Sequence, residues 1–155
     1  MKNKSLIPVW KPQGWTPLKG VGELRRKMPE YKDEKISYAG RLDPMAEGVL
    51  LLLVGDENKK RKEYEGLPKI YISEIVLGIS TDSFDALGII YSIKLGNFPS
   101  EEEIEKCLKK FIGKQDQIYP PYSSKTVNGK SLIWWTKNNR LSEIEIPKKQ
   151  IEIYS

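Results

Sequence analysis

Residues 37–55 read SYAGRLDPMAEGVLLLLVG, and this stretch decides the fold because a polar loop runs directly into an uninterrupted apolar segment. The apolar run at 49–54 has the length and composition of a buried strand. Asp43 stands before it, followed by Pro44, which has no backbone N–H to donate, and by Gly48, which lets the chain turn. The sequence therefore places one carboxylate at the entrance to the core.

Two interpretations of Asp43 are open from the residues alone. An Asp followed by Pro commonly caps the first turn of a helix, which here would be short and would end at Gly48. Alternatively, the carboxylate is a catalytic group. Capping residues far outnumber nucleophilic carboxylates, so the residue types by themselves favour the cap.

The overall composition indicates one domain with a basic surface. A chain of 155 residues is long enough for a hydrophobic core and is typical of a single domain. Lys and Arg number 26 against 21 Asp and Glu, which gives a formal net charge of +5. A positive balance of this size suits a polyanionic partner such as nucleic acid.

Several kinds of site are excluded by what the sequence lacks. It contains no histidine, so an imidazole base, a catalytic triad and a His-ligated metal are ruled out. The single cysteine, Cys107, excludes an internal disulfide and a multi-cysteine zinc site, which fits a reducing compartment. No stretch approaches the ~20 apolar residues of a membrane span. We therefore expect a cytoplasmic protein without a metal or a membrane segment.

Local patterns predict a chain that mixes strands and helices. Strands are expected at residues 7–10, 49–54, 69–78, 144–146 and 151–153. Thr16–Pro17 is a typical helix start, and apolar residues recur at helical spacing up to Met28. Ser100 and Glu103 have the spacing of a capping box for a second helix. The charged stretch 56–62 predicts a solvated helix.

Two further clusters allow a functional and a structural interpretation. Asp82 and Asp85 provide oxygen ligands for a cation, but an acidic turn that caps its own amides is favoured because the spacing fits no calcium loop. Trp134 and Trp135 offer aromatic faces for bases, yet adjacent residues point to different sides of a helix or strand. At most one tryptophan is expected to be available, and core anchoring is favoured.

Four stretches together resemble the TruB branch of the pseudouridine synthases. The string GRLDPMAEGVL is similar to the family's catalytic motif, in which Leu-Asp-Pro-x-Ala-x-Gly is the TruB form. Residues 11–14 match its Lys-Pro-x-Gly signature, and 77–88 match Leu-Gly-x-x-Thr-Asp-[Thr/Ser]-x-Asp-x-x-Gly. Residues 120–130 are similar to Pro-Pro-x-Tyr-Ser-Ala-x-Lys-x-x-Gly-Lys. The resemblance is collinear and covers nearly the whole chain.

The resemblance implies an α+β fold, with a mixed, mainly antiparallel sheet and flanking helices. Residues 1–155 would be a single catalytic domain, incomplete at its carboxy terminus and without the RNA-binding PUA domain. The implied reaction converts a uridine in the T-loop of tRNA to pseudouridine, with no net redox change and no cofactor. The T-arm of tRNA is therefore the expected partner.

The family also implies roles for individual residues. Asp43 inherits the role of nucleophile, and Tyr71, in a Lys-x-Tyr motif, would stack on the target base. Tyr38 stands where the family has a histidine. The spacing of the 120–130 segment differs from the family pattern by one residue, so which of its two lysines faces RNA stays open. The expected RNA-binding residues are Lys11, Tyr38, Arg41, Lys69, Lys125 and Lys130.

One departure from the family pattern leaves the activity open. The family's Lys-Gly-Thr-Tyr-[Ile/Val]-Arg segment, whose arginine pairs with the aspartate, has no counterpart here. We expect a missing carboxy-terminal segment or partner chain, or partial replacement by Arg41, which lies on the same face as Asp43 if that stretch is extended. The alternatives are a non-catalytic RNA-binding remnant, or a ribosomal-RNA synthase, which only Gly40-Arg41 suggests.

Overall fold

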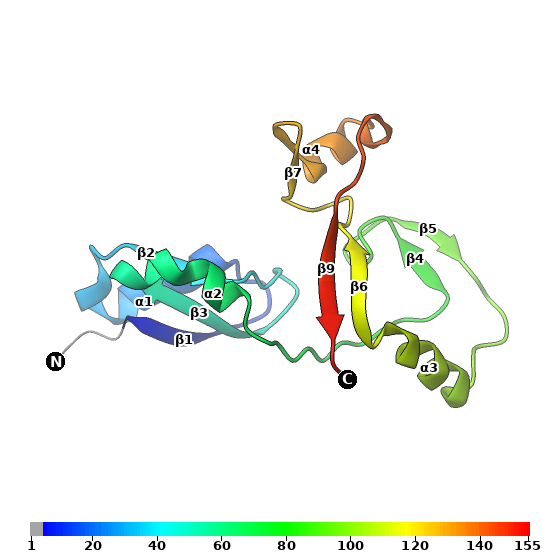
Figure 1. Cartoon of the computed structure of the whole chain (residues 1–155), viewed down its shortest axis with the longest axis horizontal. Helices are drawn as coiled ribbons and strands as arrows, with labels where there is room; N and C mark the ends of the chain where they lie inside the picture. The colour runs from blue at the N-terminus through cyan, green and yellow to red at the C-terminus, as the bar shows by residue number, and fades with distance from the viewer. Residues whose placement is uncertain (1–4) are drawn as a thin grey trace. The chain divides into compact units, whose positions relative to one another are not determined.

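The computed structural model describes residues 5–155, which divide into two compact units between Ile72 and Ser73 (Figure 1). Each unit contains helices and strands, and every strand pair found in the described part of the chain is antiparallel. The α+β class with mainly antiparallel pairing is therefore confirmed. None of the described helices is long and apolar enough to cross a membrane.

The first unit is built on a three-stranded sheet with the order β1-β3-β2. Its strands are β1 (Leu6–Lys11), β2 (Ile36–Ala39) and β3 (Gly48–Val54). The apolar run predicted to be a buried strand is β3, and it lies in the middle. Leu50 and Leu52 have no exposed surface and belong to one core cluster, as the two-residue period of a strand requires. Each buried leucine contributes about 1.5–3 kcal/mol.

Helix α1 (Pro17–Lys27) covers this sheet and confirms the predicted helix start. Thr16 is its N-cap, and the Thr16 hydroxyl accepts a hydrogen bond from the Lys19 N–H at 3.3 Å. Val21 and Leu24 of α1 are buried in the same cluster as Leu50. The short 3₁₀ helix η1 (Pro29–Tyr31) then adds Tyr31, which is also buried.

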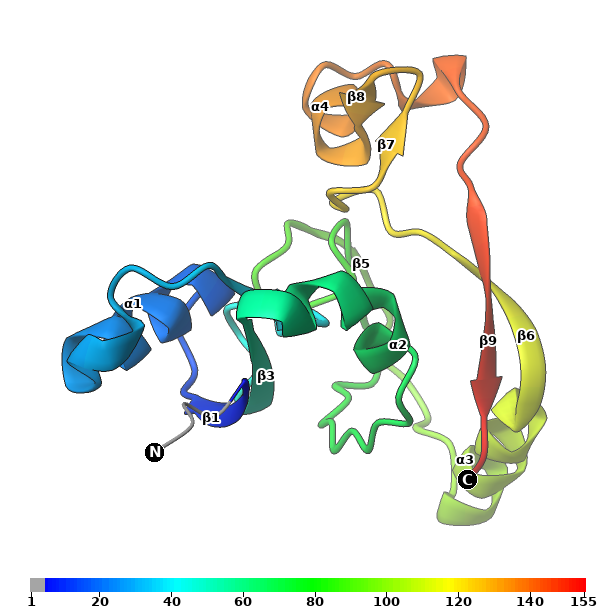
Figure 2. The same ribbon diagram turned by 60° about the vertical axis from the view of Figure 1, so that its left-hand side comes forward.

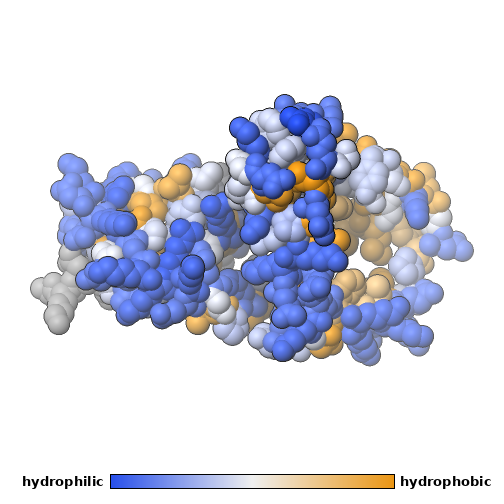
Figure 3. Space-filling model, turned by 45° about the horizontal axis from the view of Figure 1, so that its top comes forward, coloured by the Kyte–Doolittle hydropathy of each residue, from blue (hydrophilic) through white to orange (hydrophobic). Residues whose placement is uncertain are grey.

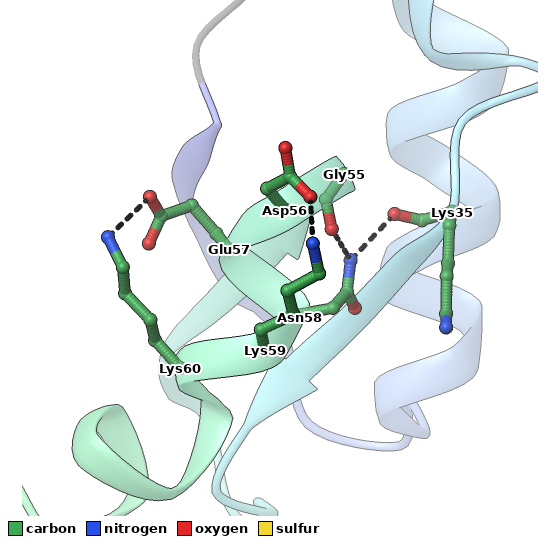
Figure 4. Close-up of polar contacts among 7 residues, drawn as sticks. All are labelled: Lys35, Gly55, Asp56, Glu57, Asn58, Lys59 and Lys60. Atoms are coloured by element: carbon green, nitrogen blue, oxygen red, sulfur yellow. Dashed lines mark hydrogen bonds and ion pairs between the residues drawn. The ribbon is translucent and has the colours of Figure 1, made fainter.

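After β3 the chain forms the 3₁₀ helix η2 (Gly55–Lys60) and the helix α2 (Arg61–Glu65), which together confirm the predicted charged helix. Lys59 pairs with Asp56 at 2.7 Å (Figure 4). Neither helix has a buried residue. The Asn58 amide donates to the carbonyls of Lys35 at 2.9 Å and Gly55 at 2.7 Å. Asn58 therefore ties η2 to the segment that leads into β2.

The second unit contains three two-stranded sheets and two helices with short 3₁₀ extensions (Figure 2). The pairs are β4 (Ile79–Thr81) with β5 (Ile90–Ile93), β6 (Gly113–Ile118) with β9 (Lys148–Ile153), and β7 (Thr126–Val127) with β8 (Lys130–Ser131). The helices are α3 (Glu101–Leu108) with η3 (Lys109–Phe111), and α4 (Leu132–Lys137) with η4 (Leu141–Glu143).

The capping box predicted for α3 is confirmed. The Ser100 hydroxyl accepts from the Glu103 N–H at 3.3 Å, and the Ser100 N–H donates to the Glu103 carboxylate at 2.8 Å. The core of this unit is small, because only Leu132 and Trp135 are buried among its hydrophobic residues. Many other apolar side chains stay at the surface, where Figure 3 colours hydrophobic residues orange.

Two strand predictions were wrong. Residues 68–76 form no helix or strand, although the sequence predicts a strand over 69–78, and Ile70 and Ile72 are 95% and 98% exposed. The boundary between the two units falls inside this segment, and β-branched residues form a strand only where a partner backbone accepts their hydrogen bonds. Residues 144–146 are likewise irregular, and the strand begins only after Pro147.

Candidate active site

Asp43 lies in the loop that connects β2 to β3. Gly40 (φ 75°) and Gly48 (φ 146°) bracket this loop in the region that favours glycine. The Ala46 N–H donates to the Asp43 carbonyl at 3.0 Å, so residues 43–46 form a turn. No helix follows Pro44, and within residues 5–155 the Asp43 carboxylate makes no hydrogen bond or ion pair. The exposed Asp43 side chain does not act as a cap in this structure.

The buried side chain of Lys11 is hydrogen-bonded to this loop. It has no exposed surface, and its ammonium group donates to the carbonyls of Pro12 at 3.2 Å, Trp15 at 2.8 Å and Ala46 at 2.6 Å. The Gly14 N–H also donates to the Pro44 carbonyl at 2.7 Å. The expected RNA contact of Lys11 does not fit this burial. Instead, Lys11 joins the turn at 12–15 to the turn that carries Asp43.

Lys69 lies against the start of the same loop. A Cβ at Gly40 would be 3.7 Å from the Lys69 Cε. The Lys69 ammonium group donates to the carbonyls of Glu65 at 2.9 Å and Leu67 at 2.8 Å, at the carboxyl end of α2. An ammonium group has three N–H donors, so one of them stays available for a ligand. Lys69 thus brings a positive charge beside the Asp43 loop.

Tyr38 and Arg41 flank Gly40 in sequence. Tyr38 is half-buried in β2, opposite Leu52, and the Arg61 guanidinium lies 5.7 Å from the centre of its ring. Arg41 is exposed in the loop. The first unit therefore gathers five of the expected site residues in and beside one connection between strands: Lys11, Tyr38, Arg41, Asp43 and Lys69.

The structure does not join Tyr71 to this group. Its side chain is 80% exposed, in the irregular segment that precedes the boundary between the units. Among the residues that are described, Tyr71 has no hydrogen bond or ring contact. Stacking of Tyr71 on a target base stays a prediction.

Lys125 and Lys130 both lie in the second unit, each against an aromatic ring. The Lys125 ammonium group is 5.4 Å from the Tyr119 ring centre, and that of Lys130 is 5.3 Å from the Trp134 ring centre. Trp135 is buried and donates to the Val127 carbonyl at 3.1 Å. Core anchoring is therefore confirmed for one tryptophan, while Trp134 stays partly exposed.

The acidic turn after β4 caps its own amides, as predicted. The Asp82 carboxylate accepts from the Ile89 N–H at 2.7 Å, and that of Asp85 accepts from the Leu87 N–H at 2.9 Å. A Cβ at Gly88 would lie 2.8 Å from the Thr81 Cβ, which explains a glycine there. Among residues 5–155 no group of acidic, histidine or cysteine side chains is arranged to hold a metal ion.

Asp82 also joins two of the sequence motifs within the second unit. The Tyr122 hydroxyl donates to the second Asp82 oxygen at 2.9 Å, across 40 residues of sequence. This hydrogen bond, with desolvation and the nearby negative charge, raises the pKa of Tyr122 above its ordinary value. The segment 77–88 is therefore held to the segment 120–130.

Replacing Asp82 by Asn should lower the pKa of Tyr122 towards the ordinary ~10 of a tyrosine, because the carboxylate no longer favours the neutral phenol. The raised pKa means that this bond stabilises the fold below pH ~10 and that its contribution is lost as the pH rises through the pKa of folded Tyr122. Absorbance titration, with Tyr122→Phe to identify the signal, measures the shift. Asp85→Asn is the control, and an unchanged Tyr122 titration in Asp82→Asn would refute the pairing.

Sequence reasoning missed two residues that the structure brings to these sites. Arg61 belongs to the predicted charged helix, and no local sequence pattern relates it to Tyr38, which lies 23 residues earlier in the chain. Tyr122 lies in a quoted motif, but its partner Asp82 is equally remote in sequence. Only a pattern of paired changes among related sequences would signal such contacts.

Comparison with known proteins agrees with these motifs. Residues 26–155 match the family described as "TruB family pseudouridylate synthase (N terminal domain)". A protein of Oceanobacillus iheyensis named tRNA pseudouridine synthase B is 37% identical over 150 residues, which cover 96% of this chain and 48% of the relative.

Two further relatives with the same name show a similar coverage. The protein of Listeria innocua is 37% identical over 150 residues, covering 97% of this chain and 48% of its own length. That of Shouchella clausii is 34% identical over 154 residues, covering 99% and 49%. The chain spans about half the length of the curated relatives that it matches. Since the family match extends over most of the chain and includes the loop of Asp43, this chain belongs to the TruB family of pseudouridylate synthases.

Proposed function

We propose that this chain isomerises a uridine of RNA to pseudouridine, and that the T-loop of tRNA is its substrate. The observation that carries the proposal is the Asp43 carboxylate, which is exposed and unpaired within the described residues. Lys11 is hydrogen-bonded to the loop that carries it, and two glycines allow the turns at the ends of that loop. A carboxylate in this state can approach a sugar carbon without first breaking a bond to the protein. The name of the relatives supports tRNA as the substrate.

The reaction exchanges the N1–C1′ and C5–H bonds for C5–C1′ and N1–H bonds, and its atoms balance without a cofactor. Asp43 attacks C1′ of the ribose and the bond from N1 of uracil to C1′ breaks, which leaves an ester between Asp43 and C1′; in the elimination alternative Asp43 takes the C2′ proton as the same bond breaks. The base turns and C5 bonds to C1′, while the ester bond breaks or the C2′ proton is returned, so that Asp43 is a free carboxylate again. C5 then loses its proton to a base and N1 gains one, so the product is an isomer of the substrate. In this proposal Tyr71 stacks on the turning base.

Positive groups beside the loop would bind the RNA backbone. Arg41 and Lys69 lie in and against the Asp43 loop, and Lys125 or Lys130 would contact RNA from the second unit. Tyr38 would contact a base that has left the stack. Lys11 supports the site from the core and binds no RNA, because its ammonium group is enclosed by three carbonyls.

Mapping of pseudouridine tests this function. The chain is incubated with unmodified tRNA, and the product is mapped by carbodiimide treatment and primer extension. We expect a stop at a single T-loop uridine. Ribosomal RNA serves as the comparison substrate. If primer extension stopped on ribosomal RNA and not on tRNA, ribosomal RNA would be the substrate instead of tRNA. Binding of tRNA without any stop would favour a non-catalytic RNA-binding protein.

A further inference from the structure

The contact between Arg61 and Tyr38 sits beside the Asp43 loop and has no assigned role. The Tyr38 ring is held by β2, where residues 36–39 pair with β3, so its position is fixed by the sheet. The Arg61 guanidinium lies 5.7 Å from the ring centre, within the ~6 Å reach of a cation–π contact. Both residues belong to the first unit. The ring therefore gives the guanidinium a defined place beside β2, two residues before the Asp43 loop begins at Gly40.

The hydrogen bonds of Arg61 leave its outer edge available. Its Nε donates to the Glu65 carboxylate at 2.7 Å, one turn further along the helix, and its side chain is 41% exposed. Within the part of the chain that the structure describes, the two terminal nitrogens of Arg61 donate to no other group. Those nitrogens carry four N–H groups in a planar arrangement that matches two oxygens of a phosphate.

The charges around this contact favour an anion. Lys69 lies against Gly40, and Arg41 follows Gly40 in the loop. The carboxylate of Glu65 is already bound to Arg61, and those of Asp56 and Glu57 on the preceding η2 pair with Lys59 and Lys60. These three carboxylates are thus each held by a cation, while Lys69, among the described residues, donates only to carbonyls and keeps its full positive charge.

We propose that Arg61 is an RNA-binding residue that takes a backbone phosphate next to the target uridine, and that Tyr38 positions its guanidinium. Tyr38 lies within cation–π distance of the guanidinium and Glu65 accepts from its Nε, so the N–H groups of the two terminal nitrogens stay available for a phosphate. A nucleotide that reaches Asp43 must place its phosphate near the loop that begins at Gly40. The inference rests on the proposed function and adds a residue that the family motifs do not include.

The test is the affinity for an unmodified T-arm stem-loop RNA, measured over a range of salt concentrations. Arg61→Gln should weaken binding roughly five- to tenfold and reduce the slope of log affinity against log salt by about 1, because one phosphate contact is lost. Arg61→Lys should keep the slope but recover only part of the affinity, since an ammonium group cannot bind two oxygens in the same plane.

Tyr38 variants separate positioning from general folding effects. Tyr38→Phe keeps the ring and should bind as the wild type does, whereas Tyr38→Leu should weaken binding. The double variant Tyr38→Leu/Arg61→Gln should lose less affinity than the sum of the two single losses, because part of the effect of the ring passes through the guanidinium. Thermal unfolding of each variant verifies that the fold is kept.

A matched control is Lys109→Gln at the start of η3, directly after α3. Lys109 also forms an i,i+4 pair, at 4.0 Å from Glu105, and its loss removes the same single charge. It should leave the affinity within about twofold and the salt slope unchanged. The proposal would be overturned if Arg61→Gln had the same salt slope as Lys109→Gln. It would also be overturned if the affinity losses of Tyr38→Leu and Arg61→Gln were strictly additive in the double variant.

The two proposals fail in distinguishable ways. If the wild type binds the stem-loop but converts no uridine, the proposed function fails. The role of Arg61 in binding is then decided separately, by the slope of log affinity against log salt for Arg61→Gln. If the wild type converts uridine and Arg61→Gln binds normally, only the inference about Arg61 fails. An absence of RNA binding by the wild type would overturn both.

Discussion

Asp43→Asn is expected to reduce pseudouridine formation by about 1000-fold or more while RNA affinity stays within a few-fold. An amide is close in shape to a carboxylate but cannot act as the nucleophile. The Asp43 carboxylate bonds to no other group in residues 5–155, so the substitution removes no structural interaction. Single-turnover kinetics on unmodified tRNA measure the rate of pseudouridine formation, and a parallel binding assay measures the RNA affinity, for the wild type and for Asp43→Asn.

Glu47→Gln is the control for this prediction. Glu47 is exposed in the same loop and carries the same charge, but it is not the aspartate of the motif. Its replacement should leave the rate within about twofold of the wild type. If Asp43→Asn kept a rate similar to that of Glu47→Gln, Asp43 would be a structural residue and another group would carry the chemistry.

Lys11→Met is expected to lower the free energy of unfolding by about 2–4 kcal/mol, because three carbonyls lose the hydrogen bonds of a buried ammonium group. The carbonyls belong to Pro12, Trp15 and Ala46, at 2.6–3.2 Å from the ammonium group. The loss is a large part of the 5–15 kcal/mol that typically stabilises a domain. Urea denaturation measures it as a lower midpoint with an unchanged slope.

Lys32→Met provides the comparison. Lys32 is exposed after η1, and the change should stay within about 0.5 kcal/mol of the wild type. Equal stability of Lys11→Met and Lys32→Met would mean that Lys11 does not hold the core in solution. It would also remove the reason for excluding Lys11 from RNA contact.

The elements that local patterns determine were predicted correctly. β1, α1 and β3 follow from apolar periodicity, from Thr16–Pro17 and from the run 49–54, each of which is readable within a few residues. The capping box of α3 is also local, since its two side chains are three residues apart. These signals need no knowledge of what lies elsewhere in the chain.

The elements that depend on remote partners were not predictable in this way. Residues 69–78 have the composition of a strand but find no partner, whereas β6 (Gly113–Ile118) is polar and forms a strand because β9 pairs with it. The same reasoning applies to the site. Asp43 was found from its motif, but lysine is rarely buried, so the enclosure of Lys11 by three carbonyls could not be foreseen. The contact of Tyr38 with Arg61 is equally non-local.

The release of the C5 hydrogen tests the central claim most directly, because C5 must lose its hydrogen once it is bonded to the sugar. tRNA carrying tritium at C5 of its uridines is incubated with the wild type and with Asp43→Asn. The account predicts that the wild type releases tritium equivalent to one uridine per tRNA and that Asp43→Asn releases none. Equal release by both proteins, or no release by a wild type that binds the tRNA, would contradict it.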